Sequence, residues 1–579
     1  MLLSKLTITP SKAQTVNRVQ LPQNNSPSLP QLPPPQDVQP PSPRTPTTPS
    51  LPPQLPPPSE LFQPNQPLPT PDEPLPETSQ IFTVKQFEVI GNTVFSLEKL
   101  NQLLAEFINK PITFAQLLEA RSKITELYIN AGYVTSGAYI PEQTLTTGVV
   151  QIQIIEGKLE DIQITGTRRL NPNYIRSRIA LGASTPLNKK RLLESLELLQ
   201  LNPLIKKLSA ELSAGSRTGA NILAIKVTEA DTFNLQTVLD NGRSPSVGSF
   251  RRELQINEAN LLGFGDSISL AYSNTDGSNT IDASYSLPLN PRNGTLTFNY
   301  GTTSANVIER PFNKLDIESA SQNYELTFRQ PLVQTPNQEF ALGITASRRE
   351  TDISSSLLEE NNVPLFILSP GADEEGRTRV SALRFFQEWT SRNSQEVIAA
   401  RSQFSLGIGA FNATINETAP DSRFFAWQGQ AQWVRLLAPD TLLLIRGDVQ
   451  LASTTLLASE QFALGGINSV RGYRQDFLLA DNGALASVEL RLPIVRVSQW
   501  NGVLQVTPFV DVGTSWNNSS SEDKNNTNTL ASVGLGLRWL QGNNFTAAVE
   551  WGIPLVSVQT QGNTWQENGL YFFVQYNPF

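Results

Sequence analysis

The sequence contains no cysteine and no histidine. The missing cysteine excludes disulfide bonds, thiolate metal ligands and a cysteine nucleophile, and the missing histidine removes the commonest general base and metal ligand. A GxSxG nucleophile elbow, a phosphate-binding GxxxxGK(S/T) loop and a dinucleotide-binding glycine fingerprint are absent as well. We therefore expect no enzymatic activity, no metal site, no cofactor and no bound nucleotide.

Basic clusters and long apolar runs are also missing. The formal net charge is -8 and no run is rich in Lys or Arg, which argues against a nucleic-acid partner because phosphates demand a basic surface. No stretch reaches the roughly 18 uninterrupted apolar residues of a membrane-spanning helix. If the protein lies in a membrane, only a closed β-barrel remains, because hydrocarbon cannot pair with backbone N–H and C=O groups.

The first residues, MLLSKLTITPSKAQ, include a lysine and a few apolar residues, but no sustained apolar core and no A-x-A cleavage pattern. A signal peptide is therefore not visible. This leaves open a trimmed chain, a mis-assigned start or a cytosolic protein.

A proline-rich segment follows, and residues 21–80 contain 22 of the 42 prolines in the chain. Such a segment has too little apolar surface to offset the conformational entropy of the chain. We expect residues 1–80 to form a disordered, extended spacer, and a proline motif for a small recognition domain is the alternative.

Residues 81–229 carry an internal repeat of about 70 residues that predicts two small α+β domains. The first, residues 81–157, has strand, helix, helix, strand and strand patterns at Phe82–Val89, Leu97–Ile108, Thr113–Asn130, Tyr133–Ile140 and Val149–Ile155. The second, residues 158–229, repeats this order at Leu159–Ile164, Tyr174–Ile179, Lys189–Leu199, Leu204–Leu212 and Ile222–Val227. Gly91 and Gly166 occupy equivalent turns between the first strand and the first helix.

Residues 230–579 consist of short segments in which apolar and polar residues alternate, as in Ala531–Trp539. A soluble sandwich would alternate too, but about sixteen such segments can be placed, an even number of the length that tilted membrane strands need. Long polar connections, such as Glu350–Arg377 and Asn517–Asn528, differ from tight ones such as Leu289–Gly294. This asymmetry is typical of outer loops and periplasmic turns of a barrel.

Two motifs, FALGGINSVRGYRQDF at Phe462–Phe477 and FVDVGTSW at Phe509–Trp516, carry a resemblance to a known family. Together with the repeat and the barrel, they resemble the two-partner-secretion transporters, the hemolysin and filamentous-adhesin exporters. This family belongs to the superfamily of POTRA-bearing outer-membrane assembly and secretion barrels. The resemblance implies two POTRA domains in the periplasm, at 81–157 and 158–229, before a sixteen-stranded outer-membrane barrel at 230–579.

The resemblance also implies site residues. A loop with the tetrad Val470, Arg471, Gly472 and Tyr473 is expected to fold into the lumen, where its arginine meets the strand motif of Phe509, Asp511 and Gly513. The alternation of side chains along a strand independently turns Asp511 toward the lumen. An unpaired carboxylate there would be costly to desolvate, and the forked guanidinium of Arg471 is suited to pair with it through two hydrogen bonds. Gly472 gives the loop tip its backbone freedom.

The two chain ends fit the family pattern less well. Phe579 matches the aromatic end of a barrel-assembly signal, although Tyr576 is one residue out of step. Ser11–Gln20 is the candidate for the short plug helix that family members often carry ahead of the linker.

The implied function is export and activation of a large secreted partner, without ATP. A β-rich exoprotein would bind the POTRA domains through an exposed sheet edge and a helix groove, and outer-membrane lipids would surround the barrel. The main alternative is an assembly insertase of the same superfamily, which usually carries more POTRA repeats. A diffusion porin or an adhesin would leave the repeats without a role.

Overall fold

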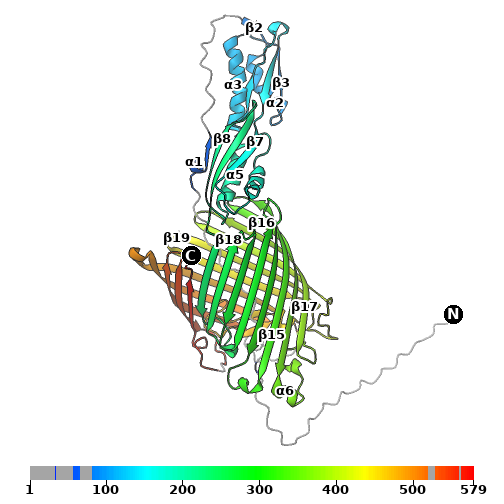
Figure 1. Cartoon of the computed structure of the whole chain (residues 1–579), viewed down its shortest axis with the longest axis vertical. Coiled ribbons are helices and arrows are strands. Elements are labelled where there is room, and N and C mark those ends of the chain that lie inside the picture. Colours follow the sequence, from blue (N-terminus) through cyan, green and yellow to red (C-terminus); the bar gives the residue numbers. More distant parts are fainter. Residues whose placement is uncertain (1–32, 34–55, 65–80, 519–527, 560–561, 579) are drawn as a thin grey trace, which may run out of the picture.

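The computed structural model describes residues 33, 56–64, 81–518, 528–559 and 562–578. Two small domains stack on one end of a large barrel (Figure 1). The predicted fold class, α+β repeats followed by a sixteen-stranded barrel, is confirmed. No helix in the described ranges is long and apolar enough to cross a membrane.

The first small domain folds around the sheet β3-β6-β5, with α3 against it. Its elements are β2 (Ile81–Thr83), β3 (Gln86–Ile90), α2 (Leu97–Leu104), β4 (Pro111–Thr113), α3 (Phe114–Asn130), β5 (Gly137–Tyr139) and β6 (Val149–Ile155). The strand predicted at Phe82–Val89 is divided into two, because Val84 leaves the strand line to enter the core. The strand predicted at Tyr133–Ile140 is shortened, because Tyr133 and Ser136 close a turn after α3.

The second small domain repeats this plan. Its elements are β7 (Lys158–Thr165), α4 (Pro172–Ala180), α5 (Lys189–Gln200), β8 (Ile205–Ala214) and β9 (Ala220–Glu229). Side-chain caps begin both helices: Asn171 accepts from the N–H of Asn173, and Asn188 accepts from the N–H groups of Lys190 and Arg191.

The repeat extends to single residues at the turn after the first strand. Gly91 and Gly166 have φ of 84° and 88°, and a Cβ on them would lie 2.4 and 2.2 Å from the carbonyl oxygens of Ile154 and Val227. Two residues after each of these carbonyls stands a glutamate, Glu156 or Glu229, whose carboxylate accepts backbone N–H groups of the same turn. One glycine and one carboxylate therefore hold the equivalent turn in both domains.

Part of the predicted disordered spacer is ordered. Residues 58–61 form the short helix α1 (Pro58–Leu61), and β1 (Phe62–Pro64) pairs in parallel with β8. Leu61 and Phe62 are buried in the core of the second domain. They are adjacent large apolar residues in an otherwise polar, proline-rich segment, and their burial offsets part of the ordering cost. The rest of 1–80, including the plug-helix candidate Ser11–Gln20, lies outside the described residues apart from residue 33.

The barrel closes with the first strand against the last, all pairs antiparallel. Its sixteen strands are β10 (Phe233–Asp240), β11 (Arg251–Ala259), β12 (Ser267–Asn274), β13 (Ser278–Pro288), β14 (Thr295–Asn306), β15 (Ile317–Gln334), β16 (Gln338–Ser355), β17 (Arg377–Arg392), β18 (Glu396–Ile408), β19 (Phe425–Ala438), β20 (Thr441–Ala452), β23 (Asn482–Val497), β24 (Gly502–Trp516), β25 (Thr529–Gln541), β26 (Phe545–Pro554) and β27 (Leu570–Tyr576).

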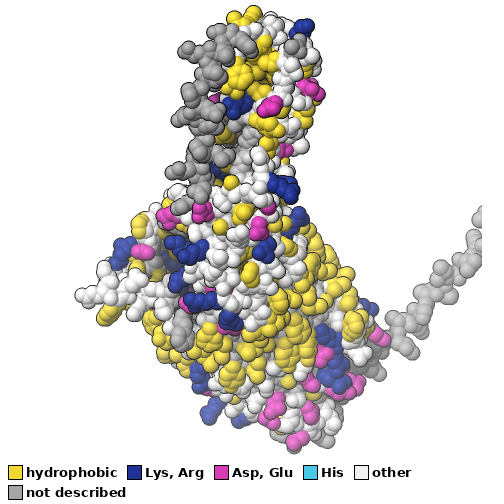
Figure 2. All heavy atoms as spheres, turned by 45° about the horizontal axis from the view of Figure 1, so that its top comes forward, with side chains coloured by type: hydrophobic (Ala, Val, Ile, Leu, Met, Phe, Trp, Pro, Cys, Tyr) yellow, Lys and Arg dark blue, Asp and Glu magenta, His cyan; other side chains and the backbone are white. Residues whose placement is uncertain are grey.

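Alternation along the strands sets the two faces of the barrel wall. On β24, Val510 and Val512 are 52% and 44% exposed on the outside, whereas Asp511 between them is 0% exposed. Figure 2 shows hydrophobic side chains gathered in a band over the visible face of the barrel. This band is the surface expected to contact lipid.

Most connections at the end that carries the small domains are short, and most at the other end are longer, although only residues 275–277 join β12 to β13 there. The predicted tight connection at 289–294 is a turn closed by the N–H of Leu289 and the carbonyl of Gly294. The connection predicted as a polar loop at Glu350–Arg377 is folded instead: β16 continues to Ser355 and α6 (Ser356–Glu360) follows (Figure 1). Buried Leu358, Leu365 and Leu368 organise it around an apolar cluster.

Candidate functional site

The loop between β20 and β23, residues 453–481, folds into the barrel. We call it the lumen loop. It contains the short pair β21 (Phe462–Leu464) and β22 (Leu478–Ala480). Its apolar side chains pack with wall residues in a cluster formed by Phe462, Leu464, Val470, Tyr473, Leu485 and Leu530. Val470 and Tyr473 of the predicted tetrad are thus buried anchors of the loop.

Arg471 lies against Asp511 of β24. Its Nε donates to Asp511 Oδ2 at 2.8 Å and its Nη2 to Asp511 Oδ1 at 3.0 Å, a bidentate pair, while its backbone N–H donates to Oδ2 at 3.1 Å. The hydroxyl of Ser487 on β23 also donates to Asp511, at 2.6 Å. The buried carboxylate therefore has four donors, as a desolvated charge requires.

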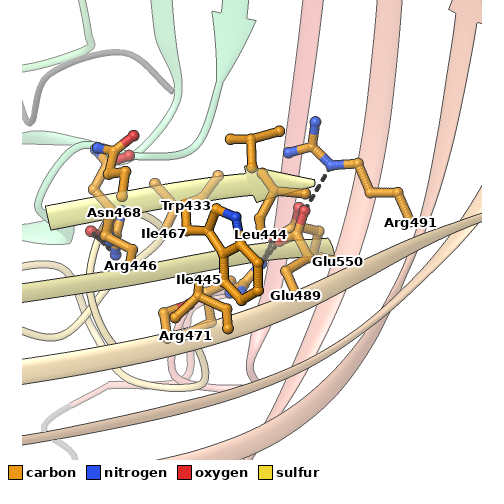
Figure 3. Close-up of a pocket in the computed structure, with 13 residues that line it drawn as sticks. Trp433, Leu444, Ile445, Arg446, Ile467, Asn468, Arg471, Glu489, Arg491 and Glu550 are labelled. Carbon is orange, nitrogen blue, oxygen red and sulfur yellow. Dashed lines mark hydrogen bonds and ion pairs between the residues drawn. The ribbon is translucent and has the colours of Figure 1, made fainter. Parts of the chain in front are cut away.

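Two more carboxylates meet the same guanidinium. Nη1 of Arg471 donates to Glu489 of β23 at 2.6 Å and to Glu550 of β26 at 3.1 Å, and Figure 3 shows these groups converging, with Arg491 on the far side of Glu489. The guanidinium carbon also stands 3.5 Å from the ring centroid of Phe509, a cation–π contact. Arg471 thus ties the loop to three wall strands at once.

The glycines at this point allow close approach. Gly472 has φ of 98°, and a Cβ on Gly552 of β26 would lie 2.6 Å from the backbone N of Gly472. Gly513 faces Leu464 and Val470, which a Cβ there would meet at 2.7 and 3.1 Å. The loop tip therefore rests directly on the backbone of the wall.

Tyr571 connects the loop tip to the last strand, β27. Its hydroxyl accepts the N–H of Gly472 at 3.0 Å and donates to the carbonyl of Tyr473. The hydroxyl of Tyr473 in turn donates to the carbonyl of Ala531 at 2.8 Å and accepts the N–H of Val556 at 3.1 Å. Two tyrosines thus fasten the loop tip to β25, β27 and the loop after β26.

The other end of the lumen loop is held by Glu460. Its carboxylate accepts from Arg384 of β17 at 2.8 and 2.9 Å and from Arg349 of β16 at 3.0 Å. β16 and β17 are the seventh and eighth strands of the ring, whereas β24 and β26, which hold Arg471, are the thirteenth and fifteenth. These pairs of strands stand on opposite sides of a closed ring of sixteen, so the loop crosses the lumen.

Contacts beyond the tip reach the junction of the first and last strands. The N–H of Gln475 donates to Gln566 at 2.9 Å, and Gln566 donates to the carbonyl oxygens of Asn241 and Arg243 just after β10. The side chain of Asn241 bonds the backbone of Leu570 and Phe572 on β27. The lumen loop is thus joined to the seam between β10 and β27.

The chemistry of the site is that of ion pairs. A cavity of about 210 Å³ beside the loop is lined by Trp433, Arg446, Arg471, Glu489, Arg491 and Glu550, among others. Within the described ranges, no group of three or more His, Cys, Asp or Glu side chains could hold a metal ion. The arrangement can hold the loop tip in place, since Arg471 pairs with carboxylates on three wall strands.

The structure brings together seven of the eight predicted residues, all in the tetrad and on β24, and places Phe509 beneath Arg471. The eighth, Phe579, lies outside the described residues. Sequence reasoning missed Tyr571, Gln566, Glu460 and Gly552. Alternation places Glu489 and Glu550 in the lumen, but no local pattern shows that they share one arginine.

Comparison with known proteins gives a consistent result. A family model described as haemolysin secretion/activation protein ShlB/FhaC/HecB matches residues 219–539, and one described as POTRA domain, ShlB-type, matches residues 82–157. The chain is 23% identical to the heme/hemopexin transporter protein HuxB of Haemophilus influenzae (strain 86-028NP) over 530 residues, covering 87% of this chain and 88% of that protein. It is 23% identical to the outer membrane transporter CdiB of Escherichia coli over 504 residues, covering 83% and 81%.

A solved structure shares the fold. CdiB from Escherichia coli matches with a TM-score of 0.65 at 21% sequence identity, covering 88% of this chain and 92% of that one.

Proposed function

Because the chain belongs to the family of haemolysin secretion/activation proteins ShlB/FhaC/HecB, we propose that its barrel is the path of one secreted partner protein, closed at rest by the lumen loop. The protein is an outer-membrane transporter of the two-partner-secretion type, with POTRA domains in the periplasm. The observation that carries the proposal is the loop held across the lumen between opposite walls, by Glu460 on one side and Arg471 on the other.

The domain boundaries are part of this proposal. Residues 81–157 and 158–229 are the two POTRA domains and residues 230–579 the barrel. Support for the second POTRA domain comes from the shared turn, in which Glu229 repeats the place of Glu156. Both domains present sheet edges, which can bind an unfolded client through main-chain hydrogen bonds.

Opening of the path has a definite cost. If Arg471 leaves, Asp511 and the two glutamates remain as buried charges, and breaking a buried pair costs about 3–5 kcal/mol. A client in the lumen offsets this cost by new contacts, and its folding outside the cell gives the transport its direction without ATP. The predicted site residues therefore act as a gate. They are Val470, Arg471, Gly472 and Tyr473 of the loop and Phe509, Asp511 and Gly513 of β24.

The function is tested by deleting the gene and identifying, by mass spectrometry, which proteins disappear from the medium. Loss of one large exoprotein with unchanged outer-membrane barrels supports a dedicated exporter. Simultaneous loss of many barrels from the membrane would instead identify an assembly insertase.

The gate is tested by the double substitution Arg471→Ala/Asp511→Ala. We expect impaired export and a larger conductance in planar bilayers, because the main tie of the loop tip is removed. Arg329→Ala/Glu339→Ala is the matched control, since it removes an ion pair that joins β15 to β16 and does not involve the lumen loop. Wild-type export and conductance in the double variant would contradict the gate.

A further inference from the structure

The inner face of β12, β13 and β14 differs in composition from the other walls of the lumen. Its twelve positions are every second residue of 267–273, 280–286 and 297–303, and they lie in matching rows across the three strands. Eight of the twelve are serine or threonine, and Asp282 is the only charged one among them. We call this surface the hydroxyl lane.

Alternation along the three strands shows which way these positions point. Leu270, Ile281 and Phe298 lie between them in the sequence and are 46%, 50% and 47% exposed on the outside of the barrel. The hydroxyl of Thr297 bonds that of Ser286 across the strands at 3.0 Å on the inner face. A hydroxyl offers one donor and two acceptor positions, so such pairs still have hydrogen-bonding capacity for a further partner.

The hydroxyl lane is accessible, whereas the wall on the other side of the lumen is covered. Ten of its twelve positions are half-buried, and only Ala271 and Thr303 are buried. On the inner face of β24, by contrast, Gln505 and Thr507 are 1% and 2% exposed. The lumen loop packs against β23 to β25 and reaches β16 and β17 through Glu460. Within the described ranges, the loop therefore leaves the third to fifth strands of the ring open to water.

The neighbouring wall, from β15 to β18, carries ion pairs instead of hydroxyls. Arg329 pairs with Glu339 and Glu388, and Arg401 pairs with Glu388 at 2.5 Å. A polypeptide that moved along this wall would have to compete with charged pairs, and each carboxylate or guanidinium left alone would be poorly solvated. Along the hydroxyl lane it would only exchange weak neutral hydrogen bonds. The lane therefore holds a passing chain least.

Both ends of the hydroxyl lane suit a path through the barrel. The second small domain rests on the periplasmic turns that lead into it: the N–H of Asn171 donates to the carbonyl of Gly263, just before β12, and Arg178 donates to Asn293, between β13 and β14, both at 2.9 Å. At the outer end, only residues 275–277 join β12 to β13. The lane thus begins directly beneath a periplasmic domain and ends under a short connection.

Resting on the proposed export function, we propose that the secreted partner crosses the barrel as an extended segment lying along the hydroxyl lane of β12, β13 and β14. The serine and threonine hydroxyls bond its main chain, which every sequence shares, so that the lane accepts the whole length of the partner. Release of the lumen loop from β24 widens the space above the lane without exposing the lane itself, which is already accessible at rest.

Thiol labelling of the full chain in detergent tests the accessibility of the lane without a partner. The chain has no cysteine of its own, so Ser284→Cys and Thr507→Cys each carry a single thiol on the inner face of β13 and β24. We expect a small water-soluble maleimide to label Ser284→Cys rapidly and Thr507→Cys slowly, as measured by mass spectrometry. Protection of Ser284→Cys to the same degree as Thr507→Cys would overturn the proposal.

The same labelling distinguishes another occupant, the chain's own N-terminal segment. If Ser284→Cys reacts only after residues 11–55 are deleted, the lane is the seat of that segment and the proposal is wrong. Equal labelling with and without residues 11–55 supports an open lane.

Substitutions in the lane test the passage. Ser284→Arg places a long charged side chain across the lane, and we expect it to lose most of the export of the exoprotein identified in the deletion experiment, with a normal amount of folded barrel. Ser284→Thr keeps the hydroxyl and should export normally. The matched control is Ala399→Arg, an equally large change on the inner face of β18, five strands away, which should also export normally. Wild-type export by Ser284→Arg would overturn the lane.

Disulfide crosslinking to a stalled partner tests the contact directly. The exoprotein carries an engineered cysteine and, at its C-terminal end, a fused stable domain that halts it in the barrel. We expect a disulfide with Ser284→Cys and none with Ala399→Cys. Crosslinks to Ala399→Cys alone would overturn the lane but leave the export function standing. Absence of any exoprotein in the medium of wild-type cells would overturn the export function, whereas thiol labelling would still decide whether the lane is open.

Discussion

Tyr571 lies at the point where the lumen loop and the last strand meet, and its hydroxyl makes two hydrogen bonds with successive loop residues. Tyr571→Phe keeps the ring and removes both bonds. At about 0.5–1.5 kcal/mol for each bond, we expect the ratio of open to closed channels to rise about 5- to 150-fold. Single-channel recordings in planar bilayers measure this ratio.

The control for this substitution is Tyr324→Phe. Tyr324 is on β15 and its hydroxyl bonds Gln322 of the same strand, away from the loop. An unchanged open fraction in Tyr571→Phe would mean that the hydroxyl does not hold the loop.

Glu229 supports a turn of the second periplasmic domain through its charge. Burial alone raises the pKa of Glu229, but the backbone N–H groups of Arg168, Leu170 and Arg169 outweigh it and hold the pKa below its ordinary value of 4.5. A lowered pKa in the folded state means stabilisation that is present above pH 4.5 and is lost as the pH falls through the folded value.

We therefore expect Glu229→Gln to lower the free energy of unfolding by about 1–3 kcal/mol at neutral pH, and the difference from wild type to shrink below pH 4.5. Thermal unfolding can be followed by the helical circular-dichroism signal, since α2 to α5 all lie in the periplasmic domains. Exposed Glu142 provides the control, Glu142→Gln. A difference of the same size at every pH would rule out the charge as its cause.

At the scale of elements, the contact between the lumen loop and β26 depends on Gly552. A Cβ there would lie 2.6 Å from Gly472 N and 2.8 Å from the carbonyl carbon of Arg471, which are backbone atoms that cannot rotate away. We expect Gly552→Ala to push the loop tip off the wall and raise the conductance while the barrel still assembles. Gly447→Ala is the control, because a Cβ on Gly447 meets only one atom, at 3.7 Å. Equal conductance in both variants would contradict a close fit of the loop on β26.

Local periodicity predicts the elements whose environment repeats along the chain. β24 alternates between lipid and lumen over its whole length, so the inward direction of Asp511 follows from spacing alone. Gly91 and Gly166 stand at equivalent turns, because in each domain the turn approaches a carbonyl that leaves no room for a side chain. The direction of Asp511 and the two glycine turns can therefore be predicted from the residues next to them in the sequence.

Other contacts join residues that are far apart in the sequence, and no local pattern contains them. Tyr571 meets a loop 99 residues earlier, and Glu550 meets Arg471 across 79 residues. Residues 56–64 were expected to be disordered from their composition, yet Leu61 and Phe62 enter a core built from residues about 100 or more positions later. Their order depends on a neighbour that only the folded domain provides.

At the scale of the whole molecule, the second periplasmic domain is fastened to the end of β11 and to the neighbouring turns of the barrel. Arg169 Nη1 donates to Glu258 at 2.7 Å, the N–H of Asn171 donates to the carbonyl of Gly263 at 2.9 Å, and Arg178 Nε donates to Asn293 at 2.9 Å. These contacts fix the direction of the two stacked small domains, residues 81–229, which we call the arm (Figure 1).

We expect Arg169→Ala/Arg178→Ala to leave both parts folded and to broaden the distribution of distances between them. Spin labels on engineered cysteines in the arm and the barrel measure these distances without background, since the chain has no cysteine. Arg191→Ala is the control, because the guanidinium of Arg191 bonds Ser184 within its own domain. A distribution as narrow as that of wild type would show that other contacts hold the arm.

The seam between β10 and β27 has four paired residues on each strand and joins positions as far apart in the sequence as Thr237 and Tyr576. Loop-closure entropy makes such a contact slow to form, so we expect it to be the last step of barrel biogenesis. The lumen loop contacts β27 across only 99 residues and can therefore hold the final strand in place until the first one arrives. A substitution that weakens the loop contact, such as Tyr571→Phe, should therefore delay insertion of the barrel as well as open the pore. The delay would be seen as accumulation of a heat-sensitive, unclosed species in semi-native electrophoresis. Normal insertion kinetics in Tyr571→Phe would refute this order of assembly.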